Sequence, residues 1–148
     1  MRILLVNGPN LNTLGRREPQ IYGSDTLADI VGRVEKRANE AGASIVPFQS
    51  NHEGAIIDFI QEQQDGADGI IINPGSLGHT SIGLRDCIAG SLLPAIEVHI
   101  SNVHAREAFR QRLVISPVCK GVITGLGWRG YLYALDTLIA AAQEGGKA

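Results

Sequence analysis

The chain has 148 residues and the composition of an ordinary globular protein, with 44% hydrophobic and 19% charged residues and a formal net charge of −2 at pH 7. This length fits one domain that buries a single sizeable core, so residues 1–148 are expected to form one domain. No basic stripe, no apolar stretch of membrane-spanning length and no signal-peptide pattern occur, so we expect a cytoplasmic protein without nucleic-acid or membrane partners.

The predicted elements alternate between strand and helix along the whole chain. Residues 2–6 form an apolar strand, and a long connection follows it. A helix is predicted to begin near Thr26, where Asp29 completes a capping box, and to end at Gly42. The later elements are strands at about 44–49, 68–73, 95–100 and 121–124 and helices at about 53–64, 81–89, 105–112 and 128–143.

Five β-α units of this length predict an α/β fold, a parallel sheet with helices on both faces and right-handed crossovers. The run Ile70-Ile71-Ile72 is typical of a central strand that is buried on both faces. We expect a flavodoxin-like three-layer sandwich with strand order 2-1-3-4-5. In such a sheet, ligands bind outside the carboxyl ends of the strands, where the strand order reverses.

Polar residues follow three strands that this order makes neighbours. Residues 7–10 (Asn-Gly-Pro-Asn) follow the first strand, and residues 73–75 (Asn-Pro-Gly) and 78–81 (Gly-His-Thr-Ser) follow the third. Glu97 and His99 stand at the end of the fourth strand. Because the carboxyl ends of parallel strands meet at one edge, these groups are expected to converge on one crevice.

The connection over residues 7–25 shows neither the strand nor the helix period. A structureless connection of this length is usually a lid or binding loop, and we place the lid at about residues 15–25. Arg17 and Tyr22 lie in it, and a fixed positive charge favours a phenolate over a phenol. The connection could therefore deliver a general base, although a flexible solvated loop is the alternative.

Glu97 and His99 are two residues apart on a strand, so their side chains point to the same face. A neighbouring carboxylate fixes the tautomer of an imidazole and favours its protonated form near neutral pH. This pattern predicts that His99 is a general acid. A structural histidine at a strand end is the alternative.

The arginines outnumber the lysines, and several fall in two clusters. A guanidinium group binds a carboxylate through two parallel hydrogen bonds, so the clusters indicate a small anionic ligand. Salt bridges along a helix face are the alternative for the second cluster. The clustered residues are Arg16, Arg17, Arg106, Arg110 and Arg112.

Other chemistries are weaker interpretations of the sequence. His79, His99, His104 and Glu97 lack the spacing of a metal site, and no metal or cofactor is expected. The glycine-rich run at 125–130 matches the dinucleotide pattern, but no strand follows it, so tight turning and close helix packing explain it better.

Two further alternatives remain open. Cys87 and Cys119 could serve a cysteine-dependent hydrolase, but neither is predicted at a strand-to-helix elbow, so buried small apolar residues are the better interpretation. A flavodoxin-like module that binds a nucleotide or flavin is the other alternative. The favoured hypothesis is acid–base chemistry: abstraction of a proton next to a carbonyl, with departure of a protonated hydroxyl, on a substrate that carries a carboxylate.

Five motifs, in this order along the chain, together resemble those of type II 3-dehydroquinate dehydratases. They cover nearly the whole chain, and Thr13, Gly83 and Cys87 are minor departures from the family pattern. The motifs are N-G-P-N-L-N-x-L-G-R-R-E-P-x-x-Y-G, Q-S-N-H-E-G, N-P-G-x-x-x-H-T-S-x-x-x-R-D, E-V-H-I-S-N-V-x-x-R-E-x-F-R and G-V-I-x-G-L-G-x-x-G-Y.

The resemblance implies a lyase that dehydrates 3-dehydroquinate to 3-dehydroshikimate by anti elimination through an enolate, the third step of the shikimate pathway. It implies no metal or cofactor. Tyr22 would remove the C2 proton, and Arg17 would favour the phenolate. His99, oriented by Glu97, would protonate the leaving C1 hydroxyl, and Asn10 would help to hold a water that supports the enolate.

The same resemblance implies how the substrate is bound. Asn73, His79 and Arg110 would contact its hydroxyl groups, and the backbone near Ile100 and Ser101 would take its carboxylate. The resemblance also implies a homododecamer, a tetramer of trimers. In it, the residue matching Asp86 reaches the site of a neighbouring subunit.

Overall fold

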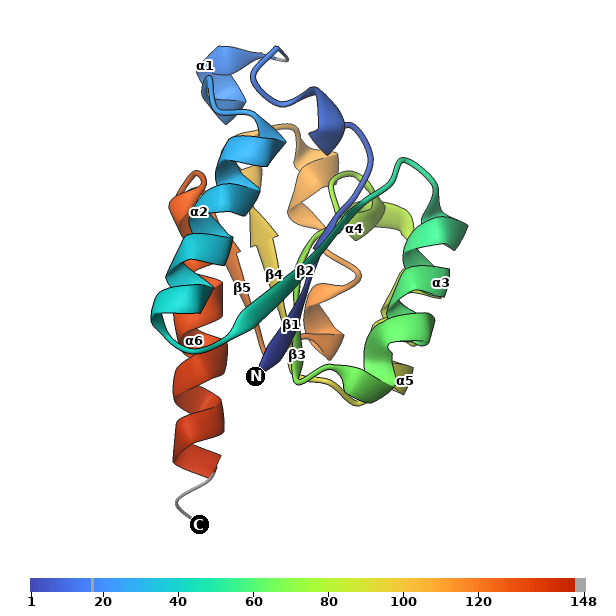
Figure 1. Ribbon diagram of the computed structural model, residues 1–148. Coiled ribbons are helices and arrows are strands. Elements are labelled where there is room, and N and C mark those ends of the chain that lie inside the picture. The colour runs from blue at the N-terminus through green and yellow to red at the C-terminus, as the bar shows by residue number, and fades with distance from the viewer. Residues whose placement is uncertain (17, 146–148) are drawn as a thin grey trace.

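The computed structural model describes residues 1–16 and 18–145, and Arg17 lies outside the described residues (Figure 1). Five parallel strands form one sheet in the order β2-β1-β3-β4-β5, which confirms the predicted order. Two strands have the predicted bounds, and each of the others differs from the prediction by one residue at one end. The strands are β1 (Arg2–Asn7), β2 (Ser44–Gln49), β3 (Gly69–Asn73), β4 (Ala95–His99) and β5 (Gly121–Thr124).

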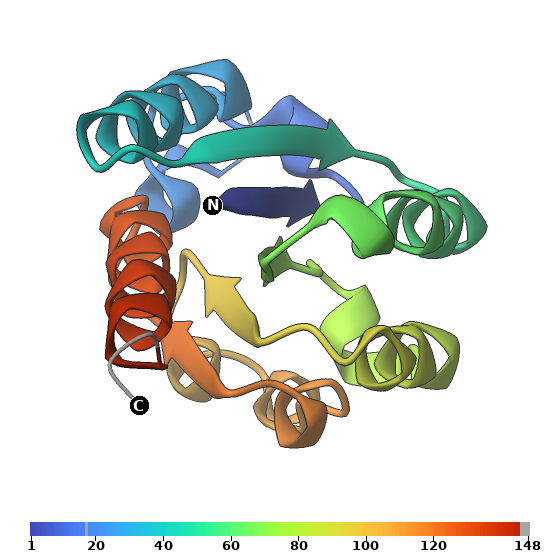
Figure 2. The same ribbon diagram turned by 60° about the horizontal axis from the view of Figure 1, so that its bottom comes forward.

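Helices cover both faces of the sheet, so the flavodoxin-like three-layer arrangement is confirmed (Figure 2). One layer consists of α2 (Leu27–Glu40) and α6 (Arg129–Gly145), and the other of α3 (Glu53–Gln63) and α5 (Ile82–Ser91). Within the part of the chain that is described, no helix combines the length and the apolar character needed to cross a membrane.

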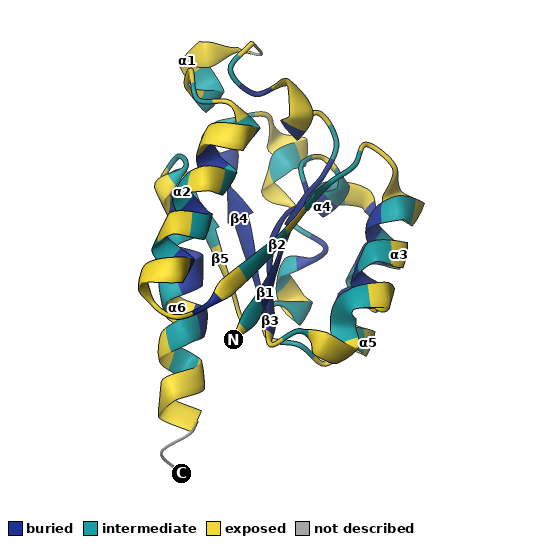
Figure 3. Ribbon diagram, viewed as in Figure 1, coloured by how far each residue is buried: buried dark blue, intermediate teal, exposed yellow. Residues whose placement is uncertain are grey.

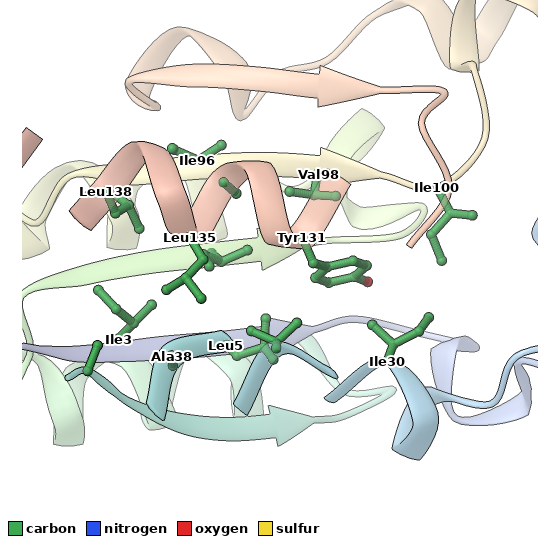
Figure 4. Close-up of a cluster of buried hydrophobic side chains, with 14 of the residues drawn as sticks. Ile3, Leu5, Ile30, Ala38, Ile96, Val98, Ile100, Tyr131, Leu135 and Leu138 are labelled. Atoms are coloured by element: carbon green, nitrogen blue, oxygen red, sulfur yellow. The ribbon is translucent and has the colours of Figure 1, made fainter. Parts of the chain in front are cut away.

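The three central strands are buried along almost their whole length (Figure 3). Successive side chains of a strand point to opposite faces, so β1 contributes to two apolar clusters. Ile3 and Leu5 pack under α2 and α6 (Figure 4), whereas Leu4 and Val6 pack under α3 and α5. Each such side chain contributes about 1.5–3 kcal/mol by its burial, and this packing fixes where the carboxyl ends of the strands lie.

The predicted capping box at the start of α2 is present. The Asp29 N–H donates to the Thr26 hydroxyl over 3.1 Å, and the Thr26 N–H donates to the Asp29 carboxylate over 2.9 Å. These hydrogen bonds lower the pKa of Asp29 from its usual value. The cap fixes where the long connection ends and the helix begins.

Two local predictions were wrong, and one short helix was not predicted. The connection after β1 is not structureless, because a 3-10 turn (Leu11–Thr13) and the one-turn helix α1 (Pro19–Tyr22) lie in it. The helix expected over 105–112 is a pair of 3-10 turns, Val103–Ala105 and Ala108–Gln111. This segment has few apolar residues to bury, which a stable α-helix would need. The one-turn helix α4 (Leu77–Thr80) was not predicted, since one turn is too short to show a period.

Two loops at the carboxyl edge of the sheet meet backbone to backbone. The Gly8 N–H donates to the Asn73 carbonyl over 2.8 Å. A Cβ atom at Gly8 would lie 2.3 Å from the Pro74 carbonyl oxygen, and one at Gly75, whose φ is +57°, would lie 3.0 Å from the Pro9 carbonyl oxygen. Only glycine fits this contact, which joins the loops after β1 and β3.

Gly8→Ala should therefore destabilise the protein by at least about 1–3 kcal/mol, because a fixed backbone group blocks the new methyl. Gly32→Ala is the matched control: Gly32 lies on the exposed side of α2, with nothing within 4 Å of a Cβ. That change should stabilise the protein by about 0.5–1 kcal/mol. Urea unfolding of both variants measures the difference, and a Gly8→Ala variant as stable as the wild type would refute the loop contact.

Candidate active site

A cleft opens at the carboxyl ends of β1, β3 and β4, where the sequence predicted convergence. Its empty volume, counted together with the open solvent at its mouth, is about 570 Å³. The short helix α1 and the 3-10 turns after β4 form its outer walls. The predicted residues that line it are Asn10, Tyr22, Asn73, His79, His99, Ile100, Ser101 and Arg110.

Of the remaining predicted residues, Arg17 is outside the described part of the chain, and Glu97 and Asp86 do not line the cleft. Glu97 is fully buried behind His99. Asp86 is exposed on α5 and lines a separate surface hollow with Gln61 and Gln64, away from the cleft of its own subunit.

The Glu97 carboxylate accepts a hydrogen bond on each of its two oxygens. His99 Nε2 donates to Oε1 over 2.8 Å, and the Ser116 hydroxyl donates to Oε2. The predicted pairing of Glu97 with His99 is thus confirmed. A carboxylate without solvent needs such partners to remain charged. With Nε2 bound to Glu97, Nδ1 is the ring nitrogen of His99 that can act on a ligand.

The second histidine of the cleft is held from a different direction. His79 Nδ1 donates to the Arg112 carbonyl over 2.9 Å, which assigns the proton of the neutral ring to Nδ1. The ring centroids of His79 and His99 are 6.3 Å apart, with an interplanar angle of 23°. Two imidazoles therefore lie side by side, each with one nitrogen fixed by the protein.

Tyr22 is half-buried and lies close to a positive charge. The Arg106 guanidinium carbon is 5.4 Å from the centroid of the Tyr22 ring, and Arg106 Nη1 donates to the Ser101 hydroxyl over 3.2 Å. Arg106 also lines the cleft, but it was noted in the sequence only as a member of an arginine cluster. The spacing of four residues between Arg106 and Arg110 was the signal in the sequence that both could face the same cleft.

The loop that carries Asn10 is held from the end of β2. The Asn10 N–H donates to Asn51 Oδ1 over 2.9 Å, and Gln49 Nε2 donates both to the Gly8 carbonyl and to Asn51 Oδ1, over 3.1 and 3.2 Å. Asn10 has a left-handed backbone, with φ at +69°. Gln49 and Asn51 thus fix the loop on which Asn10 enters the cleft, a role that sequence reasoning missed.

The cysteines lie outside the cleft and are poor nucleophiles. Burial raises the pKa of Cys87, and burial together with the charge of Glu97 raises the pKa of Cys119 to about 12. Both thiols stay protonated at neutral pH, which disfavours the hydrolase alternative.

The glycine run at 125–130 serves packing, as predicted. A Cβ at Gly125 would lie 2.9 Å from the Cβ of Asn102, and one at Gly130 would lie 3.2 Å from Val98. Small residues here let α6 begin directly against β4. Residues 1–16 and 18–145 contain no group of three side chains arranged to hold a metal ion.

Comparisons with known proteins show which family the chain belongs to. A family model described as dehydroquinase class II matches residues 1–139. A Roseiflexus castenholzii protein named 3-dehydroquinate dehydratase is 54% identical over 98% of this chain and 92% of its own length. A Neosartorya fischeri protein named catabolic 3-dehydroquinase 1 is 54% identical over 90% of this chain and 89% of its own length. The crystal structure of the Butyrivibrio crossotus type II dehydroquinase superposes with a TM-score of 0.91 at 49% identity, covering 93% of this chain and 97% of that chain. The chain therefore belongs to the class II dehydroquinase family.

Proposed function

We propose that this protein is a type II 3-dehydroquinate dehydratase, a hydro-lyase that converts 3-dehydroquinate to 3-dehydroshikimate in the shikimate pathway. The observation that carries the proposal is the presence of Tyr22 and the hydrogen-bonded His99–Glu97 pair at one cleft of a class II dehydroquinase chain. A flavodoxin-like nucleotide or flavin site is not favoured, because residues 7–10 replace the Ser/Thr-rich phosphate loop that it would need.

Tyr22 is the proposed base that removes the C2 proton of the substrate, with the C2–H electrons passing into an enolate. A free phenol titrates near pH 10, so the base needs a neighbouring positive charge in a partly dry site. We assign that charge to Arg17, and Arg106 adds a second guanidinium close to the Tyr22 ring. Closure of the connection at about 15–25 over the cleft would exclude water and strengthen both interactions.

His99 is the proposed acid. It protonates the C1 hydroxyl, whose C–O bond breaks as the enolate collapses, and water leaves without any cofactor. Glu97 supports this step because its buried carboxylate orients the imidazole through Nε2. Asn10 is proposed to hold a water against the enolate oxygen, on the loop that Gln49 and Asn51 fix.

Substrate binding is assigned to the remaining groups of the cleft. The carbonyls of Ile100 and Ser101 are bonded to the Gly127 N–H and the Thr124 hydroxyl, so their N–H groups are proposed to receive the substrate carboxylate. Hydroxyl groups of the substrate are assigned to Asn73, His79 and Arg110. Arg110 donates to Glu107 over 2.5 Å, an ion pair that lowers the pKa of Glu107 and fixes the guanidinium.

The proposed working form is a cytoplasmic homododecamer, a tetramer of trimers, in which residues 1–148 form one catalytic domain. Asp86 supports this proposal, because it is exposed on α5 and does not line the cleft of its own subunit. We propose that Asp86 completes the site of a neighbouring subunit in the trimer.

Addition of 3-dehydroquinate should produce an ultraviolet-absorbing enone product. Tyr22→Phe should lower kcat by about two to four orders of magnitude while substrate binding persists, because only the base is lost. Arg17→Ala should behave in the same way, since the phenolate loses its fixed charge. Tyr133→Phe, an exposed tyrosine on α6, is the control that should keep full activity. Turnover retained in Tyr22→Phe would remove the base assignment.

Mixed oligomers test the role of Asp86. Asp86→Asn and Tyr22→Phe subunits should each be inactive alone, but unfolding and refolding them together should recover part of the activity. Recovery requires that Asp86 of one subunit completes the site that holds Tyr22 of another, because each subunit of the mixed oligomer lacks one of the two residues. Sedimentation should give a mass about twelve times the 15.8 kDa of the chain. No recovery in a mixed oligomer of that mass would show that Asp86 acts within its own subunit.

A further inference from the structure

A chain of buried polar groups joins α6 to the carboxyl ends of β1 and β3. The Tyr131 hydroxyl donates to Asn7 Oδ1 over 2.7 Å and accepts from Asn73 Nδ2 over 2.8 Å, while Asn73 Oδ1 accepts from the Gly75 N–H over 3.2 Å. The exposed fractions of Tyr131, Asn7 and Asn73 are 0%, 1% and 3%. The Tyr131 ring packs in the apolar cluster under α6, and its hydroxyl lies toward the carboxyl ends of the strands (Figure 4).

The direction of every hydrogen bond in this chain follows from its last member. The Gly75 backbone N–H can only donate, so the Asn73 atom that it meets must be Oδ1. The amide group Nδ2 of Asn73 then faces Tyr131, and because an amide nitrogen only donates, the phenol oxygen accepts. The single proton of the Tyr131 hydroxyl is therefore directed to Asn7 Oδ1.

Reversing the Asn73 amide would break two hydrogen bonds at once. The amide nitrogen would face the Gly75 N–H, donor against donor, and Oδ1 would face a phenol oxygen whose proton is already held by Asn7. Buried groups without partners are costly, so one orientation of the amide is selected. Burial also raises the pKa of Tyr131, and the hydroxyl therefore keeps its proton at neutral pH.

Asn73 forms part of the cleft wall, and its Nδ2 carries a second N–H beyond the one bound to Tyr131. We propose that Tyr131 is a positioning residue that locks the Asn73 amide so that it presents an N–H donor to the substrate. The group it meets must be an acceptor, such as a hydroxyl or carbonyl oxygen. This inference rests on the proposed function. It gives Tyr131 a role distinct from that of Tyr22: Tyr131 keeps its proton, whereas Tyr22 is proposed to take one.

The test compares steady-state kinetics of Tyr131→Phe with those of Tyr133→Phe. Tyr131→Phe keeps the ring and removes only the hydroxyl, so KM for 3-dehydroquinate should rise about tenfold with a smaller change in kcat, because a binding contact is loosened. Tyr133→Phe, on the exposed side of the same helix, should leave KM unchanged. An unchanged KM in Tyr131→Phe would overturn the proposal.

A double-mutant cycle separates positioning from simple destabilisation. If Tyr131 acts through Asn73, adding Tyr131→Phe to Asn73→Ala should raise KM by less than twofold further. Equal effects of Tyr131→Phe in both backgrounds would contradict the inference. Should Tyr131→Phe not fold, Asn7→Ala serves in its place. This change removes the acceptor of the Tyr131 proton, so the hydroxyl can turn toward Asn73 and no longer selects one orientation of its amide. KM should likewise rise.

The wild-type assay separates this inference from the proposed function. A wild type that does not dehydrate 3-dehydroquinate refutes the proposed function and, with it, this inference. An active wild type combined with an unchanged KM in Tyr131→Phe refutes the inference alone.

Discussion

The buried carboxylate of Glu97 is the constraint on which the rest of the site depends. It lies in the middle of the central strand β4, away from solvent, and its two oxygens accept hydrogen bonds from His99 and Ser116. A charge in such a place is tolerated only when its partners are fixed, so the pair dictates the orientation of the imidazole. The small residue Gly78 lets α4 close over this pair, since a Cβ there would lie 3.2 Å from Glu97 Oε1.

The sheet order brings the other groups to this pair. Because β1 and β4 both pair with β3, the strand ends that carry Asn73 and His99 and the loop that carries Asn10 meet at one edge of the sheet. The backbone contact at Gly8 joins the loops after β1 and β3, and the hydrogen bonds through Tyr131 join the ends of the same two strands. These contacts hold together the strand ends that form the floor of the cleft. The short helix α1, which carries Tyr22, forms part of its outer wall.

Much of this structure could be predicted from patterns of neighbouring residues in the sequence. The periods of the apolar residues predicted the strands and the main helices, and the two-residue spacing of Glu97 and His99 predicted their pairing. Groups joined across long distances in the sequence were not predictable from pattern. Ser116 meets Glu97 from 19 residues away, and Tyr131 meets Asn7 from 124 residues away. The one-turn helix α1 was missed because so short an element buries too little to show a period.

The central claim is that Tyr22 and His99 act as base and acid on opposite faces of one substrate. The most direct measurement uses 3-dehydroquinate carrying deuterium on a single face of C2, with the product analysed by mass spectrometry. The account predicts loss of the deuterium that lies anti to the C1 hydroxyl and retention of the deuterium that lies syn to it. Loss of the syn deuterium would place base and acid on the same face and would contradict the mechanism.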